Sequence, residues 1–155
     1  MGKASRTGIG QGELINLLRA LRNMVFDDAD LVVATTTTKI KTTNALYYMI
    51  SGLRYTKGAT DNIDITTGAG FTNTGVGQFC KLRIEIDSAG TVTAKQGGFA
   101  TAQVLAQHPA RSASKATIGY AEIPASFTFG TSNFNDSGVA LVDGDPDLAA
   151  TQLEA

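Results

Sequence analysis

The sequence predicts a mainly β protein: a small antiparallel β-sandwich or barrel, jelly-roll-like, preceded by one N-terminal amphipathic helix. Two observations predict the β-rich part. Glycine is abundant, at 17 of 155 residues, threonine is frequent and proline is scarce, at 3 residues. This composition suits half-buried strands joined by many turns. After residue 30, short runs of β-branched and aromatic residues also alternate with turn signals, which is typical of a sandwich or barrel.

We divide the chain into three segments by expected structure and charge. Residues 1–30 form an N-terminal arm and helix, residues 31–142 a β-rich domain, and residues 143–155 an acidic tail that we expect to be loose. The net charge is −1, but the N-terminal end is basic and the C-terminal end is acidic. This asymmetry is either ordinary surface variation or a sign that the two ends meet different partners. The basic residues are too few and too scattered to predict direct nucleic-acid binding.

Leucines at helical spacing predict an amphipathic helix over residues 13–26. The helix holds about two heptads, which is too short for a stable coiled coil alone. Its apolar face must therefore dock on its own domain or on a neighbouring subunit. The residues that we expect to form this assembly interface are Leu14, Leu17, Leu18 and Leu21.

The stretch LRIEIDSAGTVTAKQG, residues 82–97, predicts a β-hairpin. The loop Ser88-Ala89-Gly90 fits a three-residue turn with Gly90 in the left-handed conformation. The polar face would face solvent or a neighbouring subunit, and a carboxylate or solvent is expected beside its like-charged pair. The predicted register pairs apolar residues on one face and polar residues on the other: Ile86 with Val92, Ile84 with Ala94, Glu85 with Thr93, and Arg83 with Lys95.

The sequence offers no constellation for catalysis. His108 is the one histidine and no nucleophile motif accompanies it, so we expect an exposed or structural histidine. Cys80 is the one cysteine, which excludes an intrachain disulfide and predicts a small buried hydrophobic residue. One histidine and one cysteine cannot supply a usual zinc ligand set. GIGQG, residues 8–12, follows no strand and is interpreted as part of the arm. We predict neither enzymatic activity nor a cofactor.

Asp143, Asp145 and Asp147 have the spacing of the first ligands of a calcium-binding loop, with Glu154 at the twelfth position. Leu148 stands where such a loop needs its turn glycine, so non-specific cation binding by a solvated tail is the favoured interpretation. No apolar run approaches the roughly 18 residues of a membrane span, and the N-terminus lacks the apolar region of a signal peptide. We expect a soluble protein, made in a cytoplasm, with no membrane partner.

Three stretches carry a resemblance: TTNALYYMISGLRYTKGATDNIDITTG, FCKLRIEIDSAGTVTAKQG and ATIGYAEIPASFTFGTSNFNDSGVALV. In this order they are similar to small virion structural proteins of tailed bacteriophages, of the capsid decoration or head fibre type. The family pattern falls on residues 48–63, 86–97, 118–123 and 127–134, and the resemblance covers about residues 42–142. One departure lies in the hairpin, where Ser88 and Ala89 precede the glycine that usually stands directly in the turn.

The resemblance implies a β-rich module that assembles as a homotrimer on a phage particle, after synthesis in the bacterial host cytoplasm. The expected function is capsid decoration: non-covalent cementing of the assembled head shell, with the major capsid protein as partner. Lys3 and Arg6 in the arm would then reach an acidic capsid surface. The alternative assembly is a monomeric sandwich with its helix folded back.

A fibre module that binds a host-surface receptor or glycan is the alternative function. Such a module needs an aromatic platform, although most of its aromatic residues are expected in the core. The candidate residues for that platform are Tyr47, Tyr48, Tyr55, Tyr120 and Phe127. An enzyme such as a depolymerase is not supported by any constellation in the chain.

Overall fold

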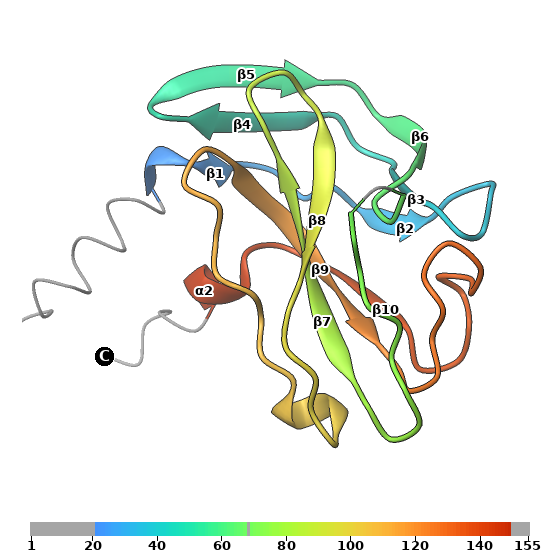
Figure 1. Ribbon diagram of the computed structural model, residues 1–155. Coiled ribbons are helices and arrows are strands. Elements are labelled where there is room, and N and C mark those ends of the chain that lie inside the picture. The colour runs from blue at the N-terminus through green and yellow to red at the C-terminus, as the bar shows by residue number, and fades with distance from the viewer. Residues whose placement is uncertain (1–20, 68, 150–155) are drawn as a thin grey trace, which may run out of the picture.

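The structure is a computed structural model, and it describes residues 21–67 and 69–149. Within these residues the protein is mainly β, with three antiparallel sheets and very little helix (Figure 1). The four-stranded sheet has the order β10-β9-β7-β8, and its strands are β7 (Cys80–Ile86), β8 (Val92–Gln96), β9 (Ala116–Ile123) and β10 (Ala140–Asp143).

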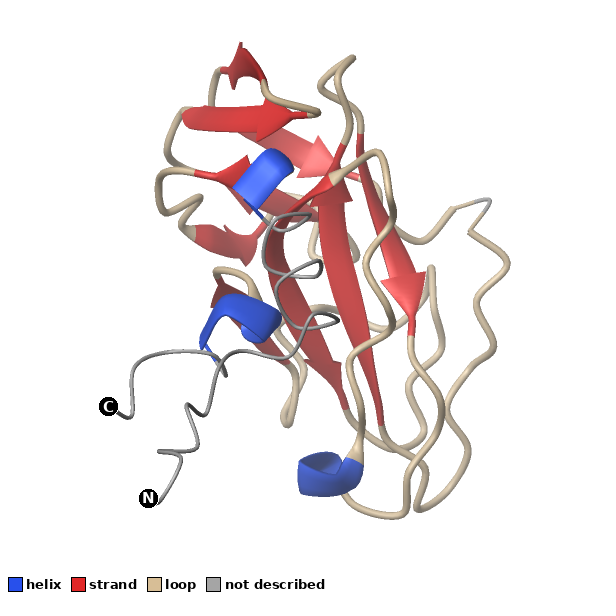
Figure 2. Ribbon diagram, turned by 90° about the vertical axis from the view of Figure 1, so that its left-hand side faces the viewer, coloured by secondary structure: helices blue, strands red, loops and turns tan. Residues whose placement is uncertain are grey.

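The two smaller sheets are built from the first part of the chain. One has the order β1-β4-β5, with β1 at Met24–Val25, β4 at Leu46–Ile50 and β5 at Leu53–Lys57. The other has the order β2-β3-β6, with β2 at Leu31–Val33, β3 at Ile40–Thr42 and β6 at Thr60–Ile63. Two short helical turns complete the fold, η1 at Gln103–Leu105 and α2 at Pro146–Ala149. Sheet β1-β4-β5 and η1 lie at opposite ends of the molecule (Figures 1 and 2).

The β7–β8 hairpin confirms the predicted register. Ile86 lies opposite Val92, Ile84 opposite Ala94, Glu85 opposite Thr93 and Arg83 opposite Lys95. Gly90 has φ of 79°, a left-handed conformation that glycine adopts without a Cβ clash. The carboxylate of Asp87 accepts hydrogen bonds from the amides of Ala89 and Thr91, each at 2.9 Å. The turn is therefore held by the residue that precedes it as well as by its glycine.

The core lies between the inner face of the β10-β9-β7-β8 sheet and the two smaller sheets. Apolar residues of β7 supply its centre, and Leu82, Ile84 and Ile86 are fully buried there. Cys80 is also fully buried, as predicted for a small hydrophobic residue. Gly119 in β9 allows a close approach, because a Cβ at this position would collide with the carbonyl oxygen of Val142 on the neighbouring strand.

The predicted helix over residues 13–26 is wrong at its C-terminal end. Helical backbone among the described residues stops at Arg22, and residues 24–25 form β1, in which Met24 lies opposite Met49 of β4. Asn23 makes the transition with its side chain. Its Oδ1 accepts from the amide of Ser51 at 2.7 Å, and its Nδ2 donates to the carbonyl of Ala113 at 2.7 Å. Pairing with β4 therefore outweighs the helical periodicity of the last apolar residues. Residues 13–20 lie outside the described residues.

Candidate assembly surface

The outer face of sheet β1-β4-β5 carries apolar side chains on β1 and β4 and the polar side chains of Arg54 and Thr56 on β5. Side chains alternate along β4, so Leu46, Tyr48 and Ile50 point into the core while Tyr47 and Met49 point outward. Phe26, just after β1, lies beside Tyr47, because its amide donates to the Tyr47 carbonyl at 2.8 Å. Phe26 is 49% exposed and Tyr47 is 53% exposed. We call the outward set the assembly face, and it consists of Met24, Phe26, Tyr47 and Met49.

The inner side of the same sheet is tightly fixed. Tyr48 is 1% exposed, and its ring stacks on that of Tyr55 with centroids 5.6 Å apart. The Tyr48 hydroxyl donates to the carbonyl of Asp87 in the β7–β8 turn at 3.1 Å. Burial is the main reason why the pKa of this hydroxyl is raised. The assembly face is thus carried by a sheet that is anchored to the core from behind.

Of the interface residues predicted from the sequence, only Leu21 lies within the described residues. Leu21 is 43% exposed and belongs to the short helical backbone before Asn23. The carbonyl of the next residue, Arg22, accepts from the amide of Gly52 in the β4–β5 turn at 3.2 Å, so this segment lies against that sheet. Five of the predicted residues lie outside the described residues and stay predictions: Lys3, Arg6, Leu14, Leu17 and Leu18.

Three residues of the assembly face, Met24, Phe26 and Met49, were not among the candidate site residues of the sequence analysis. The sequence pattern that could have identified Met49 is the alternation of LYYMI, which places every second side chain of β4 on the outer face. Among the aromatic residues considered for a glycan platform, Tyr48 and Phe127 are buried in the core and Tyr47 is exposed. Tyr55 and Tyr120 are half-buried.

The polar face of β7 is not exposed, which corrects the prediction that solvent or a neighbouring subunit covers it. Arg83 is 1% exposed and Glu85 is 2% exposed. The guanidinium of Arg83 donates to the carbonyl of Pro109 at 2.7 Å and to the carboxylate of Asp145 at 3.1 Å. It also forms an ion pair with Asp147 at 3.1 Å. The carboxylate expected beside Arg83 is present, and it comes from the C-terminal segment of the same chain.

A second set of contacts holds residues 108–115 over the same face of the sheet. Both carboxylate oxygens of Glu85 are used by Ser112, whose amide donates at 2.8 Å and whose hydroxyl donates at 2.6 Å. Arg111 forms an ion pair with Asp145, so this buried carboxylate lies between two guanidinium groups. The charged face of β7 therefore binds two segments of its own chain and offers little to a partner.

The aspartates of the C-terminal segment do not converge on one point. Asp145 binds Arg83 and Arg111, whereas Asp143 accepts from the amide of Leu31 at 3.0 Å. No three or more His, Cys, Asp and Glu side chains gather into a possible metal site within residues 21–67 and 69–149. Burial, with smaller effects from Asp28 and Asp30, raises the pKa of Asp143 to about 6. The expectation of a loose tail is wrong for Asp143 and Asp145, which are held in the fold.

His108 and Cys80 lie in structural settings. The His108 ring packs edge-on against Tyr120, with centroids 4.5 Å apart, and burial lowers the pKa of the imidazole. Burial raises the pKa of the Cys80 thiol, and the side-chain amide of Gln96 donates to its sulfur at 3.6 Å. A buried thiol with a raised pKa is a poor nucleophile at neutral pH.

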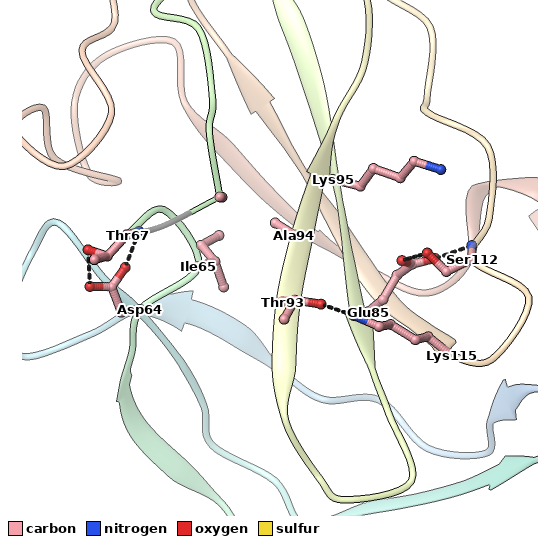
Figure 3. A pocket seen from close by; sticks show the side chains of 10 residues that line it. Asp64, Ile65, Thr67, Glu85, Thr93, Ala94, Lys95, Ser112 and Lys115 are labelled. Carbon is pink, nitrogen blue, oxygen red and sulfur yellow. Dashed lines mark hydrogen bonds between the residues drawn. The ribbon is translucent and has the colours of Figure 1, made fainter.

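A groove of about 300 Å³ lies beside the β7–β8 hairpin (Figure 3). Its walls come from the segment after β6, from β8 and from residues 112–115. The residues that line it are Asp64, Ile65, Thr67, Ala69, Glu85, Thr93, Ala94, Lys95, Ser112 and Lys115.

Comparisons with protein-family models, with curated proteins and with solved structures give no match to this chain. Among the described residues, no helix combines the length and the apolar character needed to cross a membrane.

Proposed function

We propose that the protein is a structural component of a bacteriophage virion, a capsid decoration protein that binds the assembled head shell through non-covalent contacts. The observation that carries this proposal is the assembly face. Phe26 and Tyr47, each about half exposed, lie side by side on this outward sheet face, and neighbouring exposed apolar side chains are a candidate protein–protein contact. The resemblance to phage decoration and head fibre proteins supplies the class of particle.

The size of the assembly face indicates how it would be used. A fully buried aromatic side chain removes about 150–250 Å² from water, so covering the exposed halves of two rings buries roughly 200 Å². At about 25 cal/mol per Å² this contributes about 5 kcal/mol before the entropy cost of association. Such a gain supports an interface only together with further apolar area. The predicted leucine face of residues 13–21 is the natural supplement, because the described end of that segment lies against the same sheet.

The proposal includes a homotrimer and a particle partner. Three copies that cover each other's assembly faces would hide the exposed rings, and the N-terminal arm with Lys3 and Arg6 would reach the major capsid protein. The proposal also takes the three sheets as parts of a jelly-roll-like sandwich or barrel, the fold expected from the resemblance. The protein would accumulate in the virion.

The decisive experiment compares Tyr47→Asp with Val104→Asp. Both change an exposed apolar residue into a carboxylate, but Val104, 84% exposed, lies in η1 at the opposite end of the molecule. Sedimentation velocity measures the mass of the purified protein, and cosedimentation measures its binding to phage heads assembled without it.

We expect the wild type and Val104→Asp to be trimeric and to bind heads, and Tyr47→Asp to lose both properties while keeping the wild-type circular dichroism spectrum and a cooperative unfolding transition. The proposal would be wrong if Tyr47→Asp bound heads as the wild type does. It would also be wrong if the wild type bound no heads.

A further inference from the structure

Strand β8 ends its sheet and leaves one side of its backbone unpaired. It follows β7 in the order β10-β9-β7-β8, and no strand of the described residues pairs with its other side. The hydrogen-bond pattern identifies the free groups. The amide of Gly97 donates to Lys81 at 2.8 Å, and the amide of Asp87 donates to Thr91 at 3.1 Å.

In an antiparallel pair, the residues that bond across the ladder alternate with residues whose amide and carbonyl point away. Thr91, Thr93, Lys95 and Gly97 therefore bond to β7. The backbone groups of Val92 and Ala94 point to the open edge. At the far end, the side chain of Gln96 holds Thr72 through two hydrogen bonds, of 2.9 and 2.7 Å, which closes the edge there.

The groove lies along this edge at residues 93–95. Thr93, Ala94 and Lys95 of β8 form one wall, and Asp64, Ile65 and Thr67 lie across from them (Figure 3). An unpaired strand edge is a template for another strand, and main-chain hydrogen bonds supply the affinity in such additions. The groove therefore has the shape and the backbone donors and acceptors that an extended peptide needs.

The charges of the groove favour a carboxylate on the occupant. Lys95 donates to the carbonyl of Ala110 at 2.9 Å and Lys115 to the hydroxyl of Thr93 at 2.7 Å. Neither ammonium group forms an ion pair with a carboxylate of the described residues, and each carries three donors.

The two acids of the lining are already occupied. Glu85 is buried and bound by Ser112. Asp64 accepts from the amides of Thr66 and Thr67 and from the Thr67 hydroxyl, and these bonds lower its pKa to about 2. The low pKa keeps the exposed Asp64 carboxylate charged, but Figure 3 places it on the opposite side of β8 from Lys95 and Lys115, so the donors available to a ligand lie on the lysine side of the groove.

We propose that this edge groove binds an extended, carboxylate-bearing peptide segment of a partner protein, which adds to β8 as a further strand. The segment would exchange main-chain hydrogen bonds with Val92 and Ala94 and place its carboxylate at Lys95 and Lys115. This site goes beyond the proposed function, since it lies on a different sheet from the assembly face and does not require a virion.

The test uses synthetic peptides and the isotope-labelled full-length chain. The acidic peptide VDVTVEV is titrated against the protein by NMR, in parallel with VKVTVKV and with an acidic peptide N-methylated at alternate residues. We expect the acidic peptide to shift the amide signals of Val92 and Ala94 and to slow their hydrogen exchange at least tenfold. The lysine and N-methylated peptides should bind at least tenfold more weakly.

Two variants separate the backbone and the charge contributions. Ala94→Pro removes an outward amide without removing a ladder hydrogen bond, and it should abolish peptide binding. Lys95→Gln should weaken the acidic peptide at least threefold. The matched control Lys39→Gln, in the β2–β3 turn, should leave its affinity unchanged. Since Lys95→Gln does not alter the backbone, it tests the proposal even if Ala94→Pro fails to fold.

Several outcomes would overturn the proposal: no binding of the acidic peptide, equal binding of the lysine peptide, or amide shifts away from β8. Concentration-dependent protection of Val92 and Ala94 without any peptide would show that a second copy of the chain takes the edge instead. Tyr47→Asp should bind the acidic peptide as the wild type does, so failure of the assembly face and failure of the edge groove are distinguishable.

Discussion

Replacing Arg83 tests whether the buried charges hold the fold together. Arg83→Met keeps most of the aliphatic volume and removes the guanidinium. Three buried polar groups then lose a donor: the Pro109 carbonyl at 2.7 Å, the Asp145 carboxylate at 3.1 Å and the Thr117 hydroxyl at 3.3 Å. The Asp145 side chain is 5% exposed, so water cannot replace the lost donor without a rearrangement of the C-terminal segment.

The expected cost follows from these partners. A buried carbonyl left without a donor costs about 1–3 kcal/mol. Breaking a buried ion pair costs about 3–5 kcal/mol when the remaining charge has no other partner. Asp145 keeps its ion pair with Arg111, which reduces the second contribution. The contact with Asp147 adds little, because that side chain is 51% exposed. Arg83→Met should therefore lower the free energy of unfolding by about 3 kcal/mol.

Urea unfolding followed by circular dichroism measures this change, and Lys81→Met is the matched control. Lys81 lies on the same strand and pairs with Glu122 at 3.3 Å, but their side chains are 14% and 28% exposed. Its loss should cost less than about 1 kcal/mol. In a double-mutant cycle of Arg83→Met with Asp145→Asn, the coupling energy should exceed about 1 kcal/mol. Equal costs for Arg83→Met and Lys81→Met would refute the reasoning.

Three further predictions concern Asp143, Gly119 and Cys80. The pKa of Asp143 is raised from 3.8 to about 6, so the stability that this carboxyl contributes is complete below about pH 4 and is lost as the pH rises through 6. Asp143→Asn should raise the free energy of unfolding by about 1 kcal/mol at pH 7.5, after a discount for solvent screening, and should have almost no effect at pH 3.5; an equal gain at both pH values in urea titrations would contradict this. Gly119→Ala should lower the thermal midpoint by an amount equivalent to about 1–3 kcal/mol, because its Cβ meets a backbone oxygen that cannot move freely; an unchanged midpoint in scanning calorimetry would count against the close approach. Cys80, fully buried, should react with a thiol reagent only as fast as the protein unfolds, and a burst of labelling in native buffer would be the contrary result.

Residue patterns within a short stretch of sequence are enough to specify a β-hairpin, so the β7–β8 hairpin was predicted correctly. The β7–β8 register follows from a period-two alternation on both strands and from one turn glycine, all within residues 82–97. The β4–β5 turn is equally local. Ser51 and Gly52 have φ of 52° and 84°, the left-handed pair of a tight hairpin.

At the C-terminal end of the predicted helix, residue spacing alone does not decide between helix and strand. Met24 and Val25 fit the helical spacing of the leucines before them, and they also fit a short strand. Tertiary pairing decides between the two: Met24 lies opposite Met49, and the Asn23 side chain is held by Ser51 and Ala113. A single-sequence argument cannot identify those partners, because they lie far along the chain.

The candidate surface was hard to predict because the usual relation between polarity and exposure is reversed on two strands. Antiparallel sheets commonly put polar residues on the solvent side. On β7 the charged side chains Arg83 and Glu85 are buried beneath two segments from later in the chain. On β4 the outward side chains are the uncharged Tyr47 and Met49, and the one charged residue opposite them is Arg54 at the edge of β5. A partner that covered β7 would have to displace native ion pairs, whereas a partner that covered β4 would remove apolar rings from water. The second process is favourable without any rearrangement of the chain, so self-association should be sought at the assembly face, and not on the charged face of β7.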